Sequence, residues 1–415
     1  MQGTIDIETI RNKRWFMGRN RNISSIRMAD STQIGDAEIA LLNVSFADGE
    51  QDKYAIVADE TRMGAILEAG FGGNSGSREF AGKCGTFVFL SARTRENGQV
   101  EECAGQGDLL GAKPFPGEQS NSSFLVPGHS IFKLYRRLQA GTHPEAEILR
   151  HLDCSGTCTS PQLYGECLYK AYSGETYALG ILEQLVPNAN DAWVQFCKKM
   201  NADEAAALGK ATARMHAALK TLPGTDVGNE PPPFDKLEKL LQASHDPLAK
   251  QLLESMDSLR GAFARMGAEA RGLETGNLAP QRIHGDYHLG QVLIRESVPD
   301  TTPGDDDSEF KILDFEGEPS RTLAYRRRLR SPAVDIAGML RSFRYAAATG
   351  GRDSAAAEEA FLEEYARTRP TDLENLKAAA RPHILAKAVY EACYELEFRP
   401  DWFHIPAKAL LALNA

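Results

Sequence analysis

The sequence predicts an α+β protein whose N-terminal half is rich in β-strands and whose C-terminal half is mostly helical. Short runs of β-branched and aromatic residues recur up to about residue 186, whereas apolar residues at helical spacing dominate from about residue 188 onward. A third observation is a pair of apolar runs, 291–294 and 310–313, that flank a polar loop. This pattern predicts a β-hairpin within the helical half.

The composition indicates a cytoplasmic protein. The 415 residues carry a formal net charge of −10, which argues against nucleic acid as the main partner. No apolar run is long enough to span a bilayer, and the first residues lack the basic and apolar segments of an export signal. The seven cysteines are odd in number and scattered, as expected in a reducing compartment.

Five runs in the N-terminal half predict strands, and two of them are expected to be neighbours. The runs 122–126 and 130–135 are separated only by Pro127-Gly128-His129, which predicts a turn. Lys133 lies within the second of these apolar runs, so its side chain either reaches the surface or points into a cleft. The remaining strand runs are 54–57, 86–90 and 180–187.

Apolar residues at helical spacing predict a series of helices, most of them in the C-terminal half. An earlier helix is expected to start after Pro144, because proline favours the first helical position, and Glu147 would lie in its first turns. Two helices are expected within 235–270. The other predicted helices are 205–222, 338–348, 355–368, 373–380 and 384–396.

The most informative stretch is His284-Gly285-Asp286-Tyr287-His288-Leu289-Gly290-Gln291, which is followed after the polar loop by Leu313-Asp314-Phe315-Glu316-Gly317. Pairing of the two hairpin strands would bring Asp286, Gln291 and Asp314 to one edge. Phosphoryl transfer from a nucleotide needs this set: one carboxylate orients the attacking hydroxyl, and a second carboxylate with an amide oxygen holds Mg²⁺. A surface hairpin with polar ends is the alternative, but the whole pattern in this order favours phosphoryl transfer.

These two segments resemble the catalytic and metal-binding loops of the aminoglycoside-phosphotransferase-like kinases, which are relatives of the eukaryotic-type protein kinases. The longer stretches 284–293, 313–319 and 331–343 are similar to those of bacterial maltokinases, which use ATP to phosphorylate the anomeric hydroxyl of maltose. The resemblance runs over most of the chain and implies a bilobal protein-kinase-like fold. Its parts would be an N-terminal cap subdomain (1–95), a β-rich nucleotide-binding subdomain (96–186) and a mostly helical C-terminal lobe (187–415).

The resemblance assigns the nucleotide to the β-rich part. Lys133 would steady the α- and β-phosphates of ATP, with Glu147 as its ion-pair partner; an exposed helix carboxylate is the alternative for Glu147. No GxGxxG loop precedes Lys133, and the polar segment 118–123, which includes Ser122, would contact phosphate instead; an ordinary polar turn is the alternative. The residues at the adenine edge would be Gln184 and Val186.

The same resemblance gives the residues of the phosphoryl-transfer site. Asp286 would orient and partly deprotonate the acceptor hydroxyl. His284 would brace the catalytic loop through hydrogen bonds, and Asp335 would support that loop by accepting hydrogen bonds from its backbone. The Mg²⁺ ligands would be Gln291, Asp314 and, at longer reach, Glu316.

The acceptor site is expected on the predicted helix 384–396 and just after it. Lys387, Glu391 and Tyr394 fall at i, i+4 and i+7 and therefore share one face. Periodicity alone favours a surface helix, but the resemblance implies that carboxylates here bind sugar hydroxyls and that aromatic rings stack on the sugar. The full set implied is Lys387, Tyr390, Glu391, Tyr394, Glu395 and Trp402.

We therefore expect an ATP- and Mg²⁺-dependent kinase that converts maltose to maltose 1-phosphate for α-glucan and glycogen metabolism, with a functional link to trehalose- and maltose-converting enzymes. The first alternative is a kinase of an amino sugar such as glucosamine, giving a 6-phosphate, in which Glu391 and Glu395 would face the ammonium group. The second is a catalytically silent kinase-like binding protein, against which the intact catalytic, metal-binding and phosphate-binding residues argue.

Overall fold

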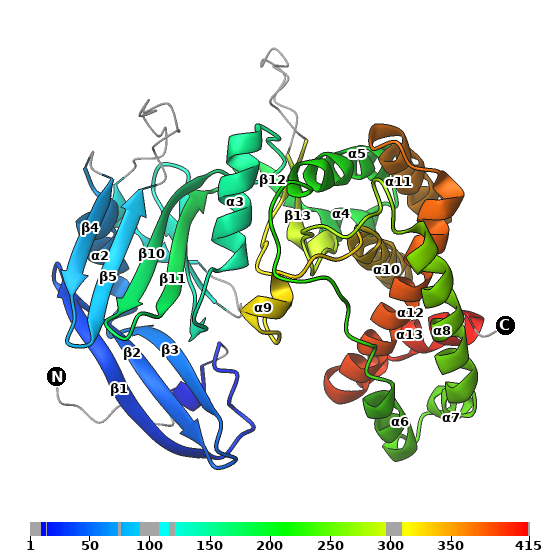
Figure 1. The fold of residues 1–415 in the computed structure, drawn as a ribbon, viewed down its shortest axis with the longest axis horizontal. Coiled ribbons are helices and arrows are strands. Elements are labelled where there is room, and N and C mark those ends of the chain that lie inside the picture. Colours follow the sequence, from blue (N-terminus) through cyan, green and yellow to red (C-terminus); the bar gives the residue numbers. More distant parts are fainter. Residues whose placement is uncertain are drawn as a thin grey trace. The chain divides into compact units, whose positions relative to one another are not determined.

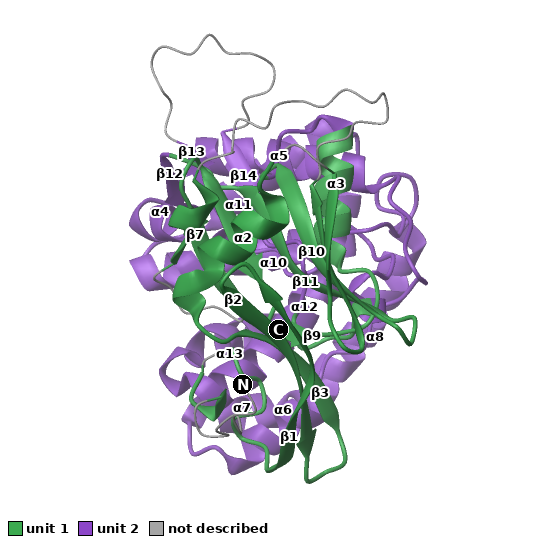
Figure 2. Ribbon diagram, turned by 90° about the vertical axis from the view of Figure 1, so that its left-hand side faces the viewer, with its two compact units in different colours: residues 1–154, 161–187, 319–323 green, residues 155–160, 188–318, 324–415 purple. Residues whose placement is uncertain are grey.

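The computed structural model describes residues 10–13, 15–73, 76–91, 108–115, 121–295 and 309–413. The chain forms two compact units, which Figure 2 colours separately. Unit 1 consists of residues 1–154, 161–187 and 319–323, and unit 2 of residues 155–160, 188–318 and 324–415. Unit 1 holds two large β-sheets and unit 2 most of the helices, so the predicted α+β fold is confirmed (Figure 1). The division into three parts at residues 95 and 186 stays a prediction.

The first sheet of unit 1 has antiparallel strands in the spatial order β1 (Ile23–Ile34), β2 (Ala37–Phe46), β3 (Gln51–Val57) and β9 (Arg137–Leu138). Trp15 and Phe16 belong to its core, and their rings contact Tyr54 of β3. Asp30 on β1 ties this sheet to the second one. Its carboxylate accepts hydrogen bonds from Cys84 N at 2.9 Å and from Tyr169 Oη at 2.8 Å.

The second sheet of unit 1 has the spatial order β4 (Ser77–Ala81), β5 (Gly85–Ser91), β10 (Leu163–Ala171), β11 (Thr176–Gln184), β8 (Ser130–Leu134), β7 (Ser122–Val126) and β6 (Lys113–Pro114). The runs predicted at 122–126 and 130–135 are therefore adjacent strands, with Val126 opposite Ser130. Helix α2 (Met63–Phe71) packs on β4 and β5. The remaining helical elements are η1 (Glu60–Arg62), η2 (Leu109–Gly111) and α3 (Pro144–Ser155).

The longest helix of unit 2 is α12 (Leu373–Phe398), for which the sequence predicted two shorter helices. The structure has one helix that runs through Pro382. Proline removes a backbone hydrogen bond and crowds the preceding turn. However, Leu385 and Val389 on the next two turns are fully buried in a core shared with α8 and α13. Burial of such side chains stabilises the helix by about 1.5–3 kcal/mol each, so α12 continues past the proline.

The other helices of unit 2 agree with the sequence in most cases, and the run 355–368 has the bounds of α11. The region 235–270 contains three helices instead of two, because Asp246 caps a separate helix: its Oδ1 accepts a hydrogen bond from Leu248 N at 2.7 Å. The helices are α4 (Ala192–Lys198), α5 (Ala202–Leu219), α6 (Phe234–Ala243), α7 (Pro247–Glu254), α8 (Met256–Leu273), α9 (Leu323–Arg326), α10 (Ala333–Gly350), α11 (Ala355–Thr368) and α13 (His404–Leu413).

The predicted β-hairpin is present in unit 2. Strands β13 (Val292–Arg295) and β14 (Phe310–Ile312) pair antiparallel, and the loop between them lies mostly outside the described residues. A third strand that the sequence did not reveal, β12 (Ala189–Asp191), pairs with β13. The turn η3 (Leu289–Gln291) connects β13 to the loop that contains Asp286. The hairpin therefore holds the loops of Asp286 and Asp314 at its open end.

Two findings of the structure concern features that the composition addressed, namely membrane spans and cysteines. In the part of the chain that the structure describes, no helix is both long and apolar enough to cross a bilayer. The described cysteines are free thiols, namely Cys84, Cys154, Cys158, Cys167, Cys197 and Cys393.

A glycine at the end of α10 gives a test of this fold. Gly351 has φ of 63°, and a Cβ there would meet no atom within 4 Å. Gly351→Ala should therefore lower the free energy of unfolding by about 1 kcal/mol, because L side chains disfavour left-handed backbone. Gly272→Ala, in the last turn of α8 and equally free of contacts, should raise it by about 0.5–1 kcal/mol. Urea unfolding of both variants measures the sign of each change in the free energy of unfolding. A Gly351→Ala variant more stable than wild type would contradict the left-handed backbone at this position.

Candidate active site

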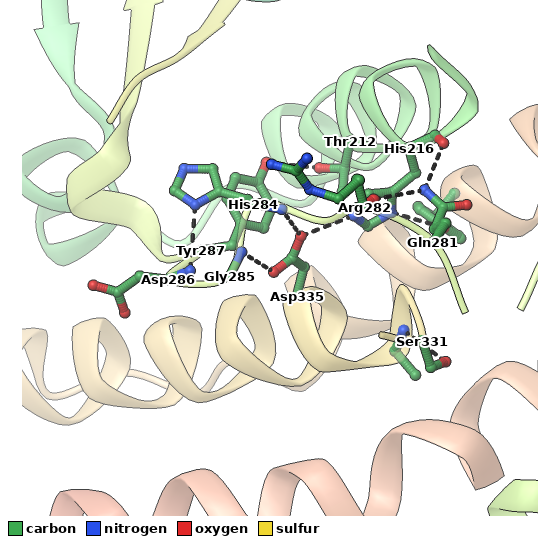
Figure 3. Close-up of polar contacts among 12 residues, drawn as sticks. Thr212, His216, Gln281, Arg282, His284, Gly285, Asp286, Tyr287, Ser331 and Asp335 are labelled. Atoms are coloured by element: carbon green, nitrogen blue, oxygen red, sulfur yellow. Dashed lines mark hydrogen bonds and ion pairs between the residues drawn. The ribbon is translucent and has the colours of Figure 1, made fainter. Parts of the chain in front are cut away.

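Asp335, near the start of α10, holds the loop that contains Asp286. The side chain is 1% exposed. Its Oδ2 accepts a hydrogen bond from His284 N at 2.8 Å, and its Oδ1 accepts one from Gly285 N at 2.9 Å (Figure 3). Burial acts to raise the pKa of Asp335, but the hydrogen bonds from His216 and from the backbone of Gly285 outweigh it and lower the pKa. The backbone contacts that the sequence predicted for Asp335 are thus present, and the carboxylate stays ionised.

A ring of buried groups fixes His216 of α5 against Asp335. His216 Nε2 lies 3.0 Å from Asp335 Oδ2, and since an ionised carboxylate only accepts, the ring proton is on Nε2. Nδ1 then accepts a hydrogen bond from Tyr365 Oη at 2.9 Å. Arg369 donates to Tyr365 Oη and to Gln281 Oε1, and Gln281 Nε2 donates back to the carbonyl oxygen of His216 at 2.7 Å. These hydrogen bonds form a closed circuit of buried groups, which rigidifies the start of the loop that contains Asp286.

His284 links the two loops of the hairpin. Its Nε2 lies 2.8 Å from the carbonyl oxygen of Leu313, and its Nδ1 lies 3.3 Å from Asp286 N. A carbonyl only accepts and a backbone N–H only donates, so His284 is the neutral tautomer with its proton on Nε2. Both ring nitrogens are therefore used in holding the loops, which fits the predicted bracing role better than a role as base.

Asp314 and Gln291 meet at the open end of the hairpin. Gln291 Nε2 donates a hydrogen bond to Asp314 Oδ2 at 2.9 Å, and Asp314 has a left-handed backbone with φ of 60°. A half-turn of the amide would present its oxygen next to the carboxylate, and these are the hard oxygen ligands that Mg²⁺ prefers. Among the described residues no group of three or more His, Cys, Asp or Glu side chains could hold a metal. The pair therefore fits an ion that takes its other ligands from water and phosphate.

Glu316 lies two residues after Asp314 but is engaged elsewhere. Its carboxylate Oε2 lies 3.6 Å from Arg326 Nη1, which also donates a hydrogen bond to the Glu316 carbonyl oxygen at 3.1 Å. Both side chains are about 6% exposed. A second-sphere position beside the metal is compatible with this pair, and direct coordination by Glu316 stays a prediction.

Asp286 forms an ion pair with Lys387 of α12, with 3.2 Å between Oδ1 and Nζ. Burial acts to raise the pKa of Asp286, but the charge of Lys387 and its hydrogen bond outweigh it and lower the pKa. Burial acts to lower the pKa of Lys387, but the charges of Asp286, Glu318 and Glu391 raise it overall. Both groups therefore stay charged at neutral pH. Each side chain remains 25% exposed, so the pair is open to a ligand.

The remaining residues of the predicted acceptor face lie along α12 and the turn after it, η4 (Pro400–Trp402). Glu391 is paired with Arg341 of α10. Glu395 is buried, and it contacts Arg399 and Tyr345. The ring of Trp402 is stacked on Tyr345 at 6.2 Å and lies beside Arg399. Tyr390 and Tyr394 are 37% and 40% exposed. This face therefore combines ion pairs with partly exposed aromatic rings.

In unit 1, Lys133 pairs with a glutamate two residues before the predicted one. Lys133 Nζ lies 2.9 Å from Glu145 Oε1, whereas Glu147 was expected. Glu145 is 1% exposed, and its other oxygen accepts a hydrogen bond from Tyr135 Oη at 2.6 Å. Helical spacing explains this pair, because Glu145 shares the buried face of α3 with Ile148, Leu149 and Leu152. The pair of Lys133 with Glu147 stays a prediction.

Ser122 is part of a buried contact in unit 1. Its hydroxyl accepts a hydrogen bond from Arg136 Nε at 2.8 Å, and Arg136 also pairs with Glu60 and lies over the ring of Trp15. Arg136 is 1% exposed. The hydroxyl of Ser122 thus anchors an arginine, and its contact with phosphate stays a prediction.

The other nucleotide residues stay predictions. Gln184 ends β11, and its Oε1 lies 3.4 Å from Gln162 N, while its backbone N–H donates to the Gln162 carbonyl oxygen at 2.9 Å. Val186 follows within the same unit. Residues 118–120 of the predicted phosphate segment lie outside the described residues.

Sequence reasoning missed Glu145, Arg341 and His216. Glu145 had a signal in the helical spacing of α3. Arg341 is an arginine among apolar residues of α10, which indicates a buried charge that needs a partner. His216 lies on the buried face of α5 and had no local signal, because its partners are 65 or more residues away.

An ionised Asp beside a lysine, and an Asp and Gln pair at the open end of the same hairpin, are side chains of the kinds that phosphoryl transfer uses. Residues 111–371 match the phosphotransferase enzyme family (APH), and the chain belongs to this family, since the match covers more than half of it. It is an enzyme that transfers phosphoryl groups to an alcohol acceptor. The expected kinship with aminoglycoside-phosphotransferase-like kinases is confirmed at the level of the family.

The chain is similar to a glucosamine kinase of Streptacidiphilus jiangxiensis, with 27% identity over 88% of this chain and 94% of that protein. It is 26% identical to a glucosamine kinase of Mycolicibacterium smegmatis, over 73% of this chain and 79% of that protein. Its fold is similar to that of a glucosamine kinase solved with glucosamine, ADP and inorganic phosphate, with a TM-score of 0.63 over 99% of this chain and 100% of that one, at 18% identity. These matches do not show the narrower kinship with maltokinases.

The buried ring around His216 makes the stability of the protein depend on pH. Burial lowers the pKa of His216 below its ordinary value of 6.5. Protonation therefore favours the unfolded chain, and the stability from this neutral histidine is present above about pH 6.5 and is lost as the pH falls, by up to about 1.4 kcal/mol per pH unit. In His216→Gln, which can still donate to Asp335, stability at pH 8 should fall but its loss between pH 7 and 5 should become shallower. Urea unfolding at several pH values measures this. Equal slopes for variant and wild type would contradict it.

Proposed function

We propose that the protein is a cytoplasmic, ATP- and Mg²⁺-dependent kinase that phosphorylates glucosamine to glucosamine 6-phosphate. The contact between Asp286 and Lys387 is the observation that supports this most, because it joins the loop of the catalytic carboxylate to the helix expected to bind the acceptor. The names of the two relatives, which align with most of both chains, favour glucosamine over maltose. With glucosamine as acceptor, the expected link to trehalose- and maltose-converting enzymes loses its basis.

In the proposed reaction, Asp286 accepts a hydrogen bond from the attacking hydroxyl of the sugar. As the new bond between that oxygen and the γ-phosphorus forms and the bond to the β,γ-bridging oxygen breaks, the proton passes to Asp286. Lys387 keeps the carboxylate oriented and ionised beforehand. Asp314 and Gln291 would hold Mg²⁺, which neutralises charge on the β- and γ-phosphates when bound.

For the nucleotide, we propose that Lys133 contacts the α- and β-phosphates. Glu145 supports this role, because a buried carboxylate at 2.9 Å fixes the direction of the ammonium group within the strand. The backbone near Gln184 and Val186 would bind the adenine edge. Ser122 would contribute a hydrogen-bond donor, since its hydroxyl accepts from Arg136 and keeps its own proton.

The charges around Lys387 favour an amino sugar as the acceptor. Asp286, Glu318 and Glu391 all raise its pKa, and since Arg341 pairs with Glu391, these three acidic groups exceed the two cations Lys387 and Arg341 by one charge. An ammonium group of the acceptor would balance that excess, whereas maltose brings no charge. The ring of Trp402 is already stacked on Tyr345, which leaves less of it for a neutral disaccharide.

A panel of acceptors tests the proposal. Purified protein with ATP and Mg²⁺ is given glucosamine, glucose, N-acetylglucosamine or maltose, and ADP release is followed with a coupled assay, with the product located by ³¹P NMR. We expect the highest kcat/KM with glucosamine and a 6-phosphate product. A maltose 1-phosphate product would restore the first expectation, and no ADP release above the water background with any sugar would support the silent binding protein.

Asp286→Asn tests the proposed base. It keeps the shape of the side chain but removes its charge and its capacity to take a proton, so kcat should fall by roughly 10²–10⁴ while the KM for ATP changes little. Asp48→Asn, at a 55% exposed carboxylate paired with Arg21, is a control that should keep wild-type turnover. Turnover of Asp286→Asn within threefold of wild type would sink the assignment.

Asp314→Asn tests the proposed metal ligand. Asn tolerates the left-handed backbone of this position, so the variant should keep the loop while losing one charge. We expect most activity to be lost at 1–2 mM Mg²⁺, roughly a tenfold higher Mg²⁺ requirement, and partial recovery at high Mg²⁺. A Mg²⁺ titration that superimposes on that of the wild type would count against the role of Asp314.

A further inference from the structure

Helices α10 and α12 are joined by two matched pairs of polar side chains. Arg341 and Tyr345 lie one turn apart on α10, and Glu391 and Glu395 lie one turn apart on α12. Arg341 binds Glu391, and Tyr345 Oη donates to Glu395 Oε1 at 3.3 Å. We call these four residues the α10–α12 ladder. Because both helices use the same i, i+4 spacing, the ladder fixes their register as well as their contact.

The bond between Arg341 and Glu391 uses only one carboxylate oxygen. Nε and Nη2 of Arg341 both donate to Glu391 Oε2, at 2.8 and 2.6 Å. A side-on pair with two parallel hydrogen bonds would occupy both oxygens. Here Oε1 of Glu391 has no hydrogen-bond partner among the described residues, and the Glu391 side chain keeps 13% exposure. One oxygen is therefore held by the protein and the other is open.

The ladder is also incomplete within the chain. Arg341 Nη1 and Glu395 Oε2 are buried and have no hydrogen-bond partner in the described part of the protein. The side chains of Arg341 and Glu395 are each 1% exposed. A buried polar atom without a partner costs about 1–3 kcal/mol, so such atoms mark places where a water or a ligand group completes the bonding.

The open oxygen lies on the face that reaches the catalytic carboxylate. Glu391 follows Lys387 by one turn of α12, and Lys387 contacts Asp286. The charge of Glu391 raises the pKa of Lys387 across that turn. Burial acts to lower the pKa of Arg341, but Glu391 raises it overall, so the pair remains ionic.

We propose that Arg341 determines the acceptor preference of the enzyme, by holding Glu391 through one oxygen and presenting the other to a cationic amino group of the substrate. This rests on the proposed function as an amino-sugar kinase. Arg341 is a positioning residue and does not itself contact the sugar. The planar guanidinium is required, because two donors that converge on Oε2 hold this oxygen in place, whereas an ammonium group is a compact point charge on a flexible stem.

A double-mutant cycle on Arg341→Lys and Glu391→Gln tests this role. The measured quantity is the ratio of kcat/KM for glucosamine to kcat/KM for glucose, with KM and kcat separated. Arg341→Lys should lower the ratio by about tenfold, mainly through the KM for glucosamine, and leave the KM for ATP unchanged. Glu391→Gln should lower it by roughly 10–100-fold. In the Glu391→Gln background, Arg341→Lys should have almost no further effect on the ratio.

Arg344→Lys is the matched control. Arg344 lies on the same helix and binds a glutamate, Glu358 of α11, at 2.7–3.1 Å, but this pair is not on the acceptor face. Its substitution should leave both sugar KM values at wild-type levels. Thermal unfolding of all variants separates loss of fold from loss of preference. An unchanged ratio in Arg341→Lys, or the same loss with and without Glu391, would overturn the proposal.

Failure of the proposed function gives a different result. If the wild type phosphorylates another sugar but not glucosamine, the acceptor assignment fails, and the cycle is run on the KM of that sugar. If the effects of Arg341→Lys and Glu391→Gln on that KM are not additive, Arg341 keeps its role in positioning Glu391. The proposed contact of Glu391 with a cationic amino group of the substrate is then wrong. Independent effects would remove the role of Arg341 as well.

Discussion

The buried carboxylate of Asp335 is the constraint on which the active-site geometry depends. An ionised group with 1% exposure is unfavourable unless donors surround it, and here His284 N, Gly285 N and His216 Nε2 supply them. These donors come from the loop and from α5, while the carboxylate belongs to α10. One side chain thereby fixes the loop against two helices, and the position of Asp286, one residue further along, follows from that contact.

The parts of the site that the sequence predicted are those in which chemistry and pairing are local. Asp286, Gln291 and Asp314 could be brought together because they lie beside two strands that had to pair, and β13 and β14 do pair. The predicted strands 122–126 and 130–135 are adjacent for the same reason. Short-range spacing and turn residues carry this information within a few residues.

The rest depended on partners that are distant along the chain. Lys133 pairs with Glu145, which the sequence analysis did not name, because the buried face of α3 brings this carboxylate to the strand. The continuity of α12 through Pro382 follows from packing against other helices, which local propensity does not contain. The acceptor could not be derived from residue types, because the same glutamates suit a neutral or a charged sugar until their contacts are known.

The unbroken course of α12 restricts how such an enzyme can change its substrate during evolution. One side of the helix is locked in the core by Leu385, Val389 and their neighbours, while the other side carries Lys387 and Glu391 at single-turn intervals. If that side binds the acceptor as proposed, a new substrate preference has few positions at which to arise, and an insertion or deletion within the helix would rotate these residues together with the core residues. We expect substrate selectivity in related enzymes to change through point substitutions on the side of α12 that carries Lys387 and Glu391, while the length of the helix is preserved.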